Sequence, residues 1–474
     1  MQALNDALLR IFSTIANACW SGPMIVILVG MGLFFTFAFG FPQIRHLGDA
    51  FKMFFAGFKK TDDGRDKEHE LSSLQSVLMA IGGQIGIGNI AGPATAILAG
   101  GPGAVFWLWV SAFFGMATIS AEATAAQMYR EVLPDGSVIG GPATYIKRAF
   151  GNNGFSKFMG AFEAVLIVVG YGVACALAQG NTVAGAMTAS FGIPGWVTGI
   201  IICLFLIYCA VKGMKGLGSL IEKMVPFMAI LYIVCGLIVV FCNISALPTA
   251  FKLIFQCAFS TKAVGGGVLG YTIKEAMSYG IRRGLFSNEA GQGSTAHAHA
   301  VAKVKHPCDQ GLVAMMSVII DTFIVLTISA IIILVSGSTE VEGLEGVQCV
   351  QYGFSSVFGQ VGSILVAVSI FFFCMSTIIS AYFVGAQNWK QLFNGKGISV
   401  YIIIMLFCAM FSTLTYVEVV WSFCDCLNGP MVVVNLIALM GICKPMIAKW
   451  KEYNNGGLKL DTSLNDVKRL SKKD

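Results

Sequence analysis

Long apolar stretches, separated by short polar segments, make up most of the chain. A transmembrane helix needs about 20 apolar residues, so each stretch predicts one span. Asp6 and Arg10 interrupt the apolar pattern of the first twenty residues, which predicts an amphipathic helix at the membrane surface. We therefore expect an all-α polytopic membrane protein with eleven spans. The stretches cover residues 22–42, 72–99, 103–129, 158–190, 196–211, 220–242, 268–301, 310–336, 359–388, 398–414 and 417–442.

The composition supports this interpretation. Of the 474 residues, 56% are hydrophobic and only 12% are charged, about half the charged fraction of soluble domains. A soluble fold has no interior large enough for so much apolar surface. The composition therefore excludes a cytosolic enzyme, a nucleic-acid binder and a disordered chain. Most of the 14 cysteines lie inside apolar stretches, where we expect small packing residues instead of disulfides or zinc ligands.

The charges between the spans predict the orientation. With an external N-terminus, the inner segments hold 25 of the 31 Lys and Arg residues, whereas the outer side holds Arg10, Lys252 and Lys262. Cytoplasmic loops are enriched in Lys and Arg. We therefore expect a multi-pass protein of the cell (inner) membrane, with the N-terminus outside and the C-terminus in the cytoplasm. The net charge of +6 then needs no nucleic acid to explain it.

Two of the predicted spans carry sequences that a continuous helix tolerates poorly. The second span has four glycines and two amides within residues 82–89, and each glycine weakens a helix by about 1 kcal/mol. The seventh span combines glycines with Arg282, Arg283 and Glu289 within residues 280–291. One such cluster could equally reflect close helix packing. Two clusters in matching positions predict two broken helices, whose unwound backbone must be satisfied by protein or by a water-filled cavity.

The two clusters divide the spans into two five-helix halves of opposite orientation, each opening with a broken helix. This is the inverted-repeat pattern of secondary transporters. An N-terminal part with the amphipathic helix, an extra span and a cytoplasmic loop comes first, and an external connection separates the repeats before a cytoplasmic tail. These five parts are residues 1–71, 72–242 (first repeat), 243–267 (connection), 268–442 (second repeat) and 443–474 (tail).

The breaks also predict a chemistry. Each half-helix leaves free N–H groups at one end and free carbonyls at the other. The N–H groups attract an anionic group such as a carboxylate, while carbonyls together with hydroxyls or amides form an oxygen cage for a small cation. A site that offers both suits a zwitterion carried together with a cation.

Two motifs resemble the alanine/glycine:cation symporter family. The first is residues 86–92, Gly-Ile-Gly-Asn-Ile-Ala-Gly, followed by residues 100–107; the second is residues 283–291, Arg-Gly-Leu-Phe-Ser-Asn-Glu-Ala-Gly. The resemblance covers nearly the whole chain. It implies a LeuT-like fold with discontinuous first and sixth core helices and one extra N-terminal span. It also implies sodium coupling, import of a small neutral amino acid and no catalytic cofactor, and we expect a monomer.

The resemblance and the breaks together define a candidate site. We expect the substrate between the two broken helices, and a sodium ion shared between the first broken helix and a serine–threonine pair of the ninth span. The expected substrate-binding residues are Gln84, Ile87, Gly88, Asn89, Gln179, Leu285, Phe286, Ser287 and Ala381. The expected sodium ligands are Gly82, Ile85, Ser376 and Thr377.

The chain departs from the family pattern where specificity is expected. The family usually has threonines at the positions of Gln84 and Ile87, and a large indole at Ala381. The indole restricts the pocket to glycine and alanine, so its loss predicts a roomier pocket for glutamine, serine or a similar neutral amino acid. The opposing interpretation is that another bulky side chain, such as Phe286 or Tyr382, refills the space.

Several alternatives stay open. Asp321 is the strongest proton-relay candidate if coupling uses protons in place of sodium. Arg282, Arg283 and Glu289 are intramembrane charges, for which function and a bracing ion-pair network are equally consistent. A channel needs repeated filter segments, and an enzyme needs a nucleophile with a base; neither pattern is visible in the sequence. We expect no enzymatic activity.

Overall fold

The computed structural model describes residues 2–20, 22–58, 70–133, 136–259, 272–413 and 417–456. Lys262, the end of the expected connection 243–267 and most of the expected tail 443–474 lie outside these residues. The described chain forms a helical bundle with one short antiparallel hairpin, in which Glu131 pairs with Ile139.

The first half of the described chain, which ends at Cys242, contains eleven α-helices, one π-helical segment and the hairpin. Their bounds are α1 Gln2–Cys19, α2 Gly22–Ala38, α3 Pro42–Arg45, α4 Leu47–Ala56, α5 Ser73–Gln84, α6 Ile87–Gly100, α7 Ala104–Met128, β1 Glu131–Val132, β2 Val138–Ile139, α8 Pro142–Phe150, α9 Gly154–Leu166, η1 Ile167–Cys175, α10 Ala176–Phe191 and α11 Gly195–Cys242.

The second part begins with a short 3₁₀ turn and continues to the last described helix. Its elements are η2 Ile244–Ala246, α12 Leu247–Phe259, α13 Ile273–Asn288, α14 Ser294–Ala300, α15 Pro307–Val318, η3 Ile319–Leu326, α16 Thr327–Ser336, η4 Ser338–Glu340, α17 Val347–Phe358, α18 Gln360–Leu392, α19 Ile398–Ser412, α20 Val417–Gly441 and α21 Cys443–Asn454.

The expected apolar stretches are largely helical. Residues 196–211 and 220–242, which the sequence predicts as separate spans, form two helical arms of α11 on either side of a kink at Gly213, where φ is 60°. The middles of α9–α10 and of α15–α16 are π-helical, in η1 and η3. Among the described helices, six are long and apolar enough to cross a membrane, or up to eight if each bent pair is one span.

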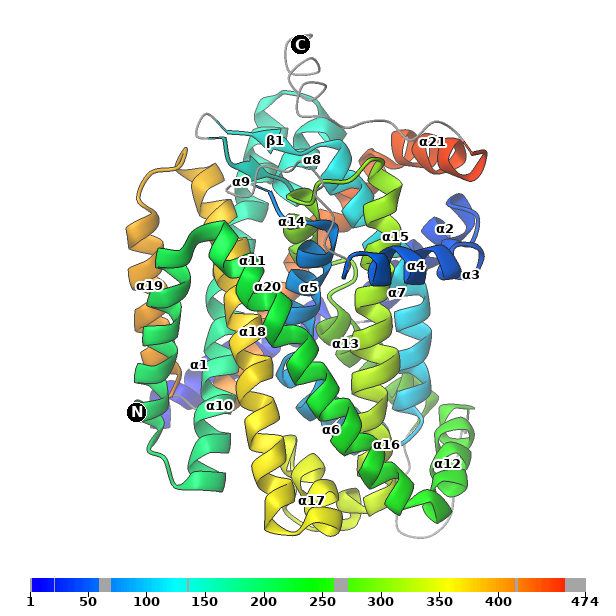
Figure 1. Cartoon of the computed structure of the whole chain (residues 1–474), viewed down its shortest axis with the longest axis vertical. Coiled ribbons are helices and arrows are strands. Elements are labelled where there is room, and N and C mark those ends of the chain that lie inside the picture. The colour runs from blue at the N-terminus through cyan, green and yellow to red at the C-terminus, as the bar shows by residue number, and fades with distance from the viewer. Residues whose placement is uncertain are drawn as a thin grey trace.

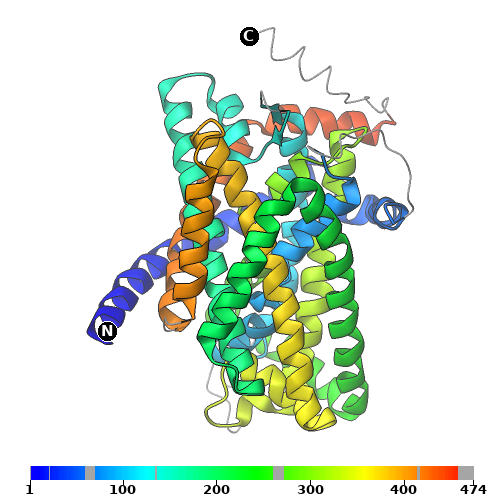
Figure 2. The same cartoon turned by 60° about the vertical axis from the view of Figure 1, so that its left-hand side comes forward.

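The polar connections gather at the two ends of the bundle. In Figure 1 the hairpin, α8 and α21 lie at the end where the C-terminus is drawn, whereas α12 and α17 lie at the opposite end. Figure 2 shows α1 projecting from the bundle beside the N-terminus. The last described helix, α21, is held by the buried Trp450. Its ring stacks on that of Phe39, with the ring centroids 4.9 Å apart.

The first break separates α5 from α6, which are bent by 41° relative to each other. A capping box of Ser72 and Gln75 begins α5. At the break, a Cβ on Gly86 would lie 2.7 Å from Thr377 Oγ1 and 2.9 Å from Gln179 Nε2. Glycine is therefore required there because two other helices approach the backbone closely.

The second break lies later than the glycine cluster 280–291 suggests. Helix α13 continues to Asn288, and the chain is non-helical until α14 begins at Ser294. Glu289, Gly291 and Gly293 have positive φ values of 55°, 98° and 81°. Gly280, by contrast, lies inside α13, where a Cβ would be 2.4 Å from the carbonyl oxygen of Ala104 in α7.

Gly280 therefore provides a test of helix packing. We expect Gly280→Ala to lower the thermal stability of the purified protein, because overpacking against backbone costs about 1–3 kcal/mol. Gly185→Ala on α10 is the matched control, because a Cβ there meets nothing within 4 Å. Equal melting temperatures for both variants would contradict the close α13–α7 contact.

Candidate functional site

A buried polar cavity lies between the two breaks. Its volume is about 20 Å³, which is room for about one water molecule. It is bounded by the first break, the π-helical segment η1, the second break and α20. The lining residues are Gly83, Gln84, Gly86, Gly88, Gly170, Tyr171, Cys175, Gln179, Phe286, Glu289, Gln292, Cys424 and Asn428.

Two amide side chains organise the cavity side of the first break. Gln179 of α10 accepts a hydrogen bond from the Ile87 N–H at 3.2 Å. Gln84 donates through Nε2 to the carbonyl of Asn288 at 2.6 Å, and so connects the two broken helices. The Gln84 Oε1 atom has no hydrogen-bond partner among the described residues. It is therefore available as an acceptor, beside the first-turn N–H groups of α6 at Ile87 and Gly88.

The expected sodium ligands lie together on the other side of the same break. The Ser376 hydroxyl is 3.0 Å from the Gly82 carbonyl oxygen. The Thr377 hydroxyl is 3.1 Å from the Gly82 oxygen and 3.4 Å from that of Ile85. Four oxygen atoms thus converge at the carbonyl end of α5, where the helix dipole favours a cation. Oxygen ligands are those that hard cations prefer.

Asp321 joins both broken helices from η3. Its carboxylate accepts hydrogen bonds from Asn89 Nδ2 at 2.7 Å and from the Ser287 hydroxyl at 2.9 Å. The neighbouring Thr322 hydroxyl donates a third bond at 2.7 Å. The other end of the Asn89 amide accepts from the Gly86 N–H at 3.1 Å. Both ends of that amide are therefore engaged by protein groups, which makes Asn89 a brace of the break in this structure.

The cavity brings together only part of the expected substrate set. Four of the nine expected residues line it, and they are Gln84, Gly88, Gln179 and Phe286. The other five are buried nearby without being among the lining residues, and they are Ile87, Asn89, Leu285, Ser287 and Ala381. The carbonyl of Ala381 accepts a hydrogen bond from the Tyr401 hydroxyl at 3.3 Å, so α19 packs against this part of α18.

Several lining residues are absent from the sequence-based set. Tyr171 and Cys175 come from η1, and Tyr171 hydrogen bonds to Glu289. Asn428 of α20 accepts from Gln292 Nε2 at 2.7 Å. Asn428 lies in an Asn-Gly-Pro sequence within an apolar stretch, a polar signal like the ones that mark the two breaks. The apolar sequence around Tyr171 gives no comparable signal.

The C-terminal half of α13 bounds one end of the cavity with charged and aromatic side chains. Arg282 is hydrogen bonded to Asp425 of α20, and Arg283 lies 3.9 Å from the same carboxylate oxygen. The Arg283 guanidinium lies 5.4 Å from the centre of the Trp421 ring, within cation–π range. That ring contacts Phe286, which lines the cavity, at 4.9 Å. The two arginines thus form a bracing network in this structure.

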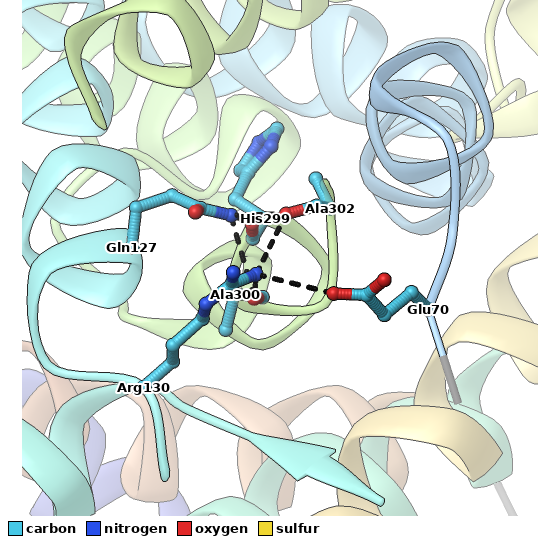
Figure 3. A network of polar contacts seen from close by, with 6 residues as sticks. All are labelled: Glu70, Gln127, Arg130, His299, Ala300 and Ala302. Carbon is cyan, nitrogen blue, oxygen red and sulfur yellow. Dashed lines mark hydrogen bonds and ion pairs between the residues drawn. The ribbon is translucent and has the colours of Figure 1, made fainter. Parts of the chain in front are cut away.

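Figure 3 shows a polar network where the end of α7 meets the end of α14. Gln127, near the end of α7, donates through Nε2 to the carbonyls of His299 and Ala302, the latter at 2.8 Å. Arg130 donates to the Ala302 carbonyl at 3.0 Å and lies 3.9 Å from the Glu70 carboxylate. These contacts cap the last carbonyls of α14 and connect them to the segment that precedes α5.

The main chain adds a second connection at the same end. The Leu71 N–H donates to the Val301 carbonyl at 3.0 Å, and the Lys303 N–H donates to the Leu71 carbonyl at 3.1 Å. The start of α5 and the end of α14 are therefore held together by backbone bonds.

Two interrupted helices around a buried polar cavity, within a bundle of apolar helices, define a membrane transporter with a LeuT-like fold. The chain belongs to the sodium:alanine symporter family, whose family model matches residues 5–463. The resemblance carried by residues 86–92 and 283–291 is therefore confirmed, and the chain is a transporter.

Similar proteins support this assignment. The chain is 36% identical over 448 residues to the "Sodium/alanine symporter AgcS" of Methanococcus maripaludis, covering 93% of this chain and 96% of that protein. It is 35% identical over 435 residues to the "Probable sodium/glutamine symporter GlnT" of Bacillus subtilis, covering 92% and 88%. It is 37% identical over 457 residues to the "Putative sodium/proton-dependent alanine carrier protein YrbD" of Bacillus subtilis, covering 92% and 90%.

The fold is also similar to a solved structure, the substrate-bound outward-open state of a Na⁺-coupled sialic acid symporter. The TM-score is 0.51 at 14% identity, and the match covers 92% of this chain and 86% of that one. At this identity the likeness concerns the fold alone.

The network of Figure 3 makes the cavity testable from this end of the bundle, which we expect to face the cytoplasm. We expect Arg130→Gln to increase the rate at which a membrane-impermeant thiol reagent modifies Cys175, which lines the cavity. A hydrogen bond to a charged group contributes about 1.5–3 kcal/mol, so the inner end should open about tenfold more often. Peptide mapping of inside-out vesicles measures the rate at Cys175 separately from the other cysteines.

The control for this experiment is Lys147→Gln, which removes a partly exposed pair at the same end, 3.4 Å from Glu131. We expect no change in that variant. If Cys175 reacts at the same rate in Arg130→Gln and in the parent protein, the network does not hold the inner end closed.

Proposed function

We propose that this chain is a sodium-coupled symporter that imports a small neutral amino acid by alternating access. One observation carries the proposal: the first break presents a four-oxygen set at the end of α5 and the first-turn N–H groups of α6, of which that of Ile87 donates to Gln179, on either side of Gly86. A cation and a carboxylate thus have matching partners within one break. The family and the relatives named for sodium and alanine agree with this chemistry.

The geometry supports specific roles at the cavity. The substrate carboxylate faces the N–H groups of Ile87 and Gly88, and the unpartnered Gln84 Oε1 accepts from its ammonium group. Gln179 positions the Ile87 N–H. Phe286 bounds the space for the side chain of the substrate. Leu285, Ser287 and Asn89 support this arrangement from behind the lining residues.

Sodium supplies both order and driving force. Bound between the hydroxyls of Ser376 and Thr377 and the carbonyls of Gly82 and Ile85, it would hold the break in the substrate-binding shape. Sodium then raises amino-acid affinity, and by linkage the amino acid raises sodium affinity equally. One elementary charge moving inward across 100 mV gains about 2.3 kcal/mol, to which the sodium gradient adds.

The membrane arrangement is part of the same proposal. We propose eleven spans, in which the two arms of α11 count separately and α19 is one short span. Residues 72–242 and 268–442 form the two inverted repeats, between an N-terminal part of residues 1–71 and the tail 443–474. The protein acts as a monomer with its N-terminus outside and its C-terminus in the cytoplasm. The gathering of the hairpin, α8 and α21 at one end of the bundle supports that polarity.

The size of the substrate is the finer part of the proposal. Relatives are named for alanine and for glutamine. Ala381 is buried without lining the cavity, so the missing indole does not by itself enlarge this cavity. Gln84 adds an amide oxygen that suits a polar side chain. We therefore propose alanine as a substrate and retain glutamine or serine as larger ones.

Uptake by the purified protein in liposomes tests the function. We expect an inward sodium gradient to drive accumulation of radiolabelled alanine, with glutamine and serine tested in parallel. We expect Thr377→Ala to raise the half-saturating sodium concentration, because the bound ion loses one oxygen ligand. Leaving a polar group without its partner in a buried site costs about 1–3 kcal/mol. Uptake at saturating sodium should change less.

The control is Thr188→Ala, which removes a hydroxyl that bonds only within its own helix and the following loop. It should leave the sodium dependence unchanged. An unaltered half-saturating sodium concentration in Thr377→Ala would refute the proposed sodium ligands, and uptake without any ion gradient would refute symport itself.

Proton coupling is the second candidate, and Asp321 is the observation that favours it. Its buried carboxylate contacts both broken helices and has no Lys, Arg or His within salt-bridge distance among the described residues. One relative is named as sodium/proton-dependent. A protonatable group that connects both moving helices is a reasonable proton carrier.

A pH gradient without sodium separates the two candidates, and Asp321→Asn tests the role of the carboxylate. We expect a pH gradient alone to drive no uptake in the parent protein, and sodium-driven uptake to fall in Asp321→Asn because its amide cannot accept all the bonds of the carboxylate. Proton coupling predicts the opposite: uptake driven by a pH gradient in the parent protein, lost in the variant. Transport currents and radiolabel uptake measure both.

A further inference from the structure

A second cavity lies on the side of the bundle, apart from the transport site. Its volume is about 340 Å³, and it shares no lining residue with the central cavity. It lies between the two arms of α11 and the middle of α18. The residues that line it are Ile201, Phe205, Leu220, Lys223, Met224, Phe227, Phe371, Phe372 and Met375.

The lining is apolar apart from one residue, Lys223. Ile201 and Phe227 at the edge are 41% and 53% exposed, so the cavity opens on the outer surface of the bundle, which faces lipid in a membrane. Empty space against apolar side chains loses dispersion contacts. A flexible hydrocarbon chain can fill an open apolar groove of this kind, whereas water gains no hydrogen-bond partners there.

The charges around the turn of α11 indicate which kind of lipid headgroup would bind beside the cavity. Lys212, Lys215 and Lys223 are all exposed in this segment. Its acidic residue, Glu222, accepts a hydrogen bond from Gln75 Nε2 at 2.9 Å. Figure 1 shows this turn of α11 near the upper end of its two arms. Basic pockets between transmembrane helices on the cytoplasmic side bind anionic lipid headgroups.

We propose that this cavity binds an anionic phospholipid of the cytoplasmic leaflet, with an acyl chain between α11 and α18 and its phosphate beside Lys223. The leaflet assignment rests on the orientation proposed above. Lys223 both lines the cavity and is exposed, so it lies at the mouth, where an acyl chain continues into its headgroup.

The cavity shares a wall with the proposed sodium site. Met375 directly precedes Ser376 on α18. Met224 precedes Val225, whose Cγ2 lies 3.1 Å from the position of a Cβ built on Gly82. A bound acyl chain therefore supports, from behind, α18, which carries the hydroxyls of Ser376 and Thr377, and α11, which packs against Gly82. Occupancy of the cavity should lower the half-saturating sodium concentration.

Lipid retention measured by native mass spectrometry tests the site without requiring transport. The full-length protein is equilibrated with phosphatidylglycerol or with phosphatidylcholine before measurement. We expect it to retain phosphatidylglycerol preferentially. Lys223→Gln should reduce this preference about fivefold, as expected for the loss of one cation near an anionic lipid. Ile201→Trp should reduce the retention of both lipids by filling the cavity.

Two matched controls accompany these variants. Lys396→Gln removes another exposed lysine away from the cavity, and Ile200→Trp adds the same bulk at a neighbouring residue, 43% exposed, that does not line it. Both should behave as the parent protein. No preference for phosphatidylglycerol in the parent protein, or equal losses in Ile200→Trp and Ile201→Trp, would overturn the proposal.

Sodium titration of uptake in vesicles provides the second measurement. The parent protein should require less sodium in phosphatidylcholine vesicles that contain phosphatidylglycerol than in phosphatidylcholine alone, and Ile201→Trp should abolish the difference. Equal values in the parent protein would overturn the link to the sodium site. If the parent protein shows no sodium-driven uptake, the proposed function is refuted. The lipid retention measured by native mass spectrometry still decides whether the cavity binds lipid.

Discussion

Backbone groups that leave a helix at membrane depth must find partners inside the protein, and this constraint determines the centre of the molecule. Asn89 accepts from the Gly86 N–H at the first break. Gln179 reaches the same break from α10. At the second break the Gly293 N–H donates to Glu122 of α7 at 2.9 Å. Side chains from surrounding helices therefore hold both breaks open, and the polar cavity exists because of them.

The same requirement couples the two broken helices. Asp321 is fully buried, and it is stabilised by donors that come from both breaks, Asn89 and Ser287. A buried carboxylate without these donors would be strongly destabilising. Gln84 adds a direct hydrogen bond to Asn288. Neither broken helix can therefore move far without disturbing the partners of the other.

The two ends of the cavity are bounded by different chemistry. One end depends on side chains, with Arg282 and Arg283 sharing Asp425 and an aromatic ring beside Arg283. The other end combines the side chains of Gln127 and Arg130 with main-chain bonds between Leu71 and the segment around Ala302. Side-chain rotamers can rearrange locally, whereas the main-chain bonds separate only when whole helix ends move apart. Opening at the two ends is thus a different physical event.

Sequence reasoning reached far into this fold because its strongest signals are local. Apolar stretches located the helices, and the glycine-rich residues 82–89 located the first break. The family resemblance placed Ser376 and Thr377 beside Gly82, as the distances of 3.0 and 3.1 Å agree. The same reasoning missed the π-helical segment that carries Tyr171, because a change of backbone hydrogen bonding leaves no trace in an apolar sequence.

The sequence by itself determined the class of protein, since hydropathy and the spacing of glycines and charges act within a few turns of one helix. Only the tertiary structure decided that the two arms of α11 meet at a kink at Gly213, and that the second break begins at Glu289. It also decided which side chains face the cavity: Asn428 lines it and Ala381 does not. Those outcomes depend on contacts between residues hundreds of positions apart, which no local pattern encodes.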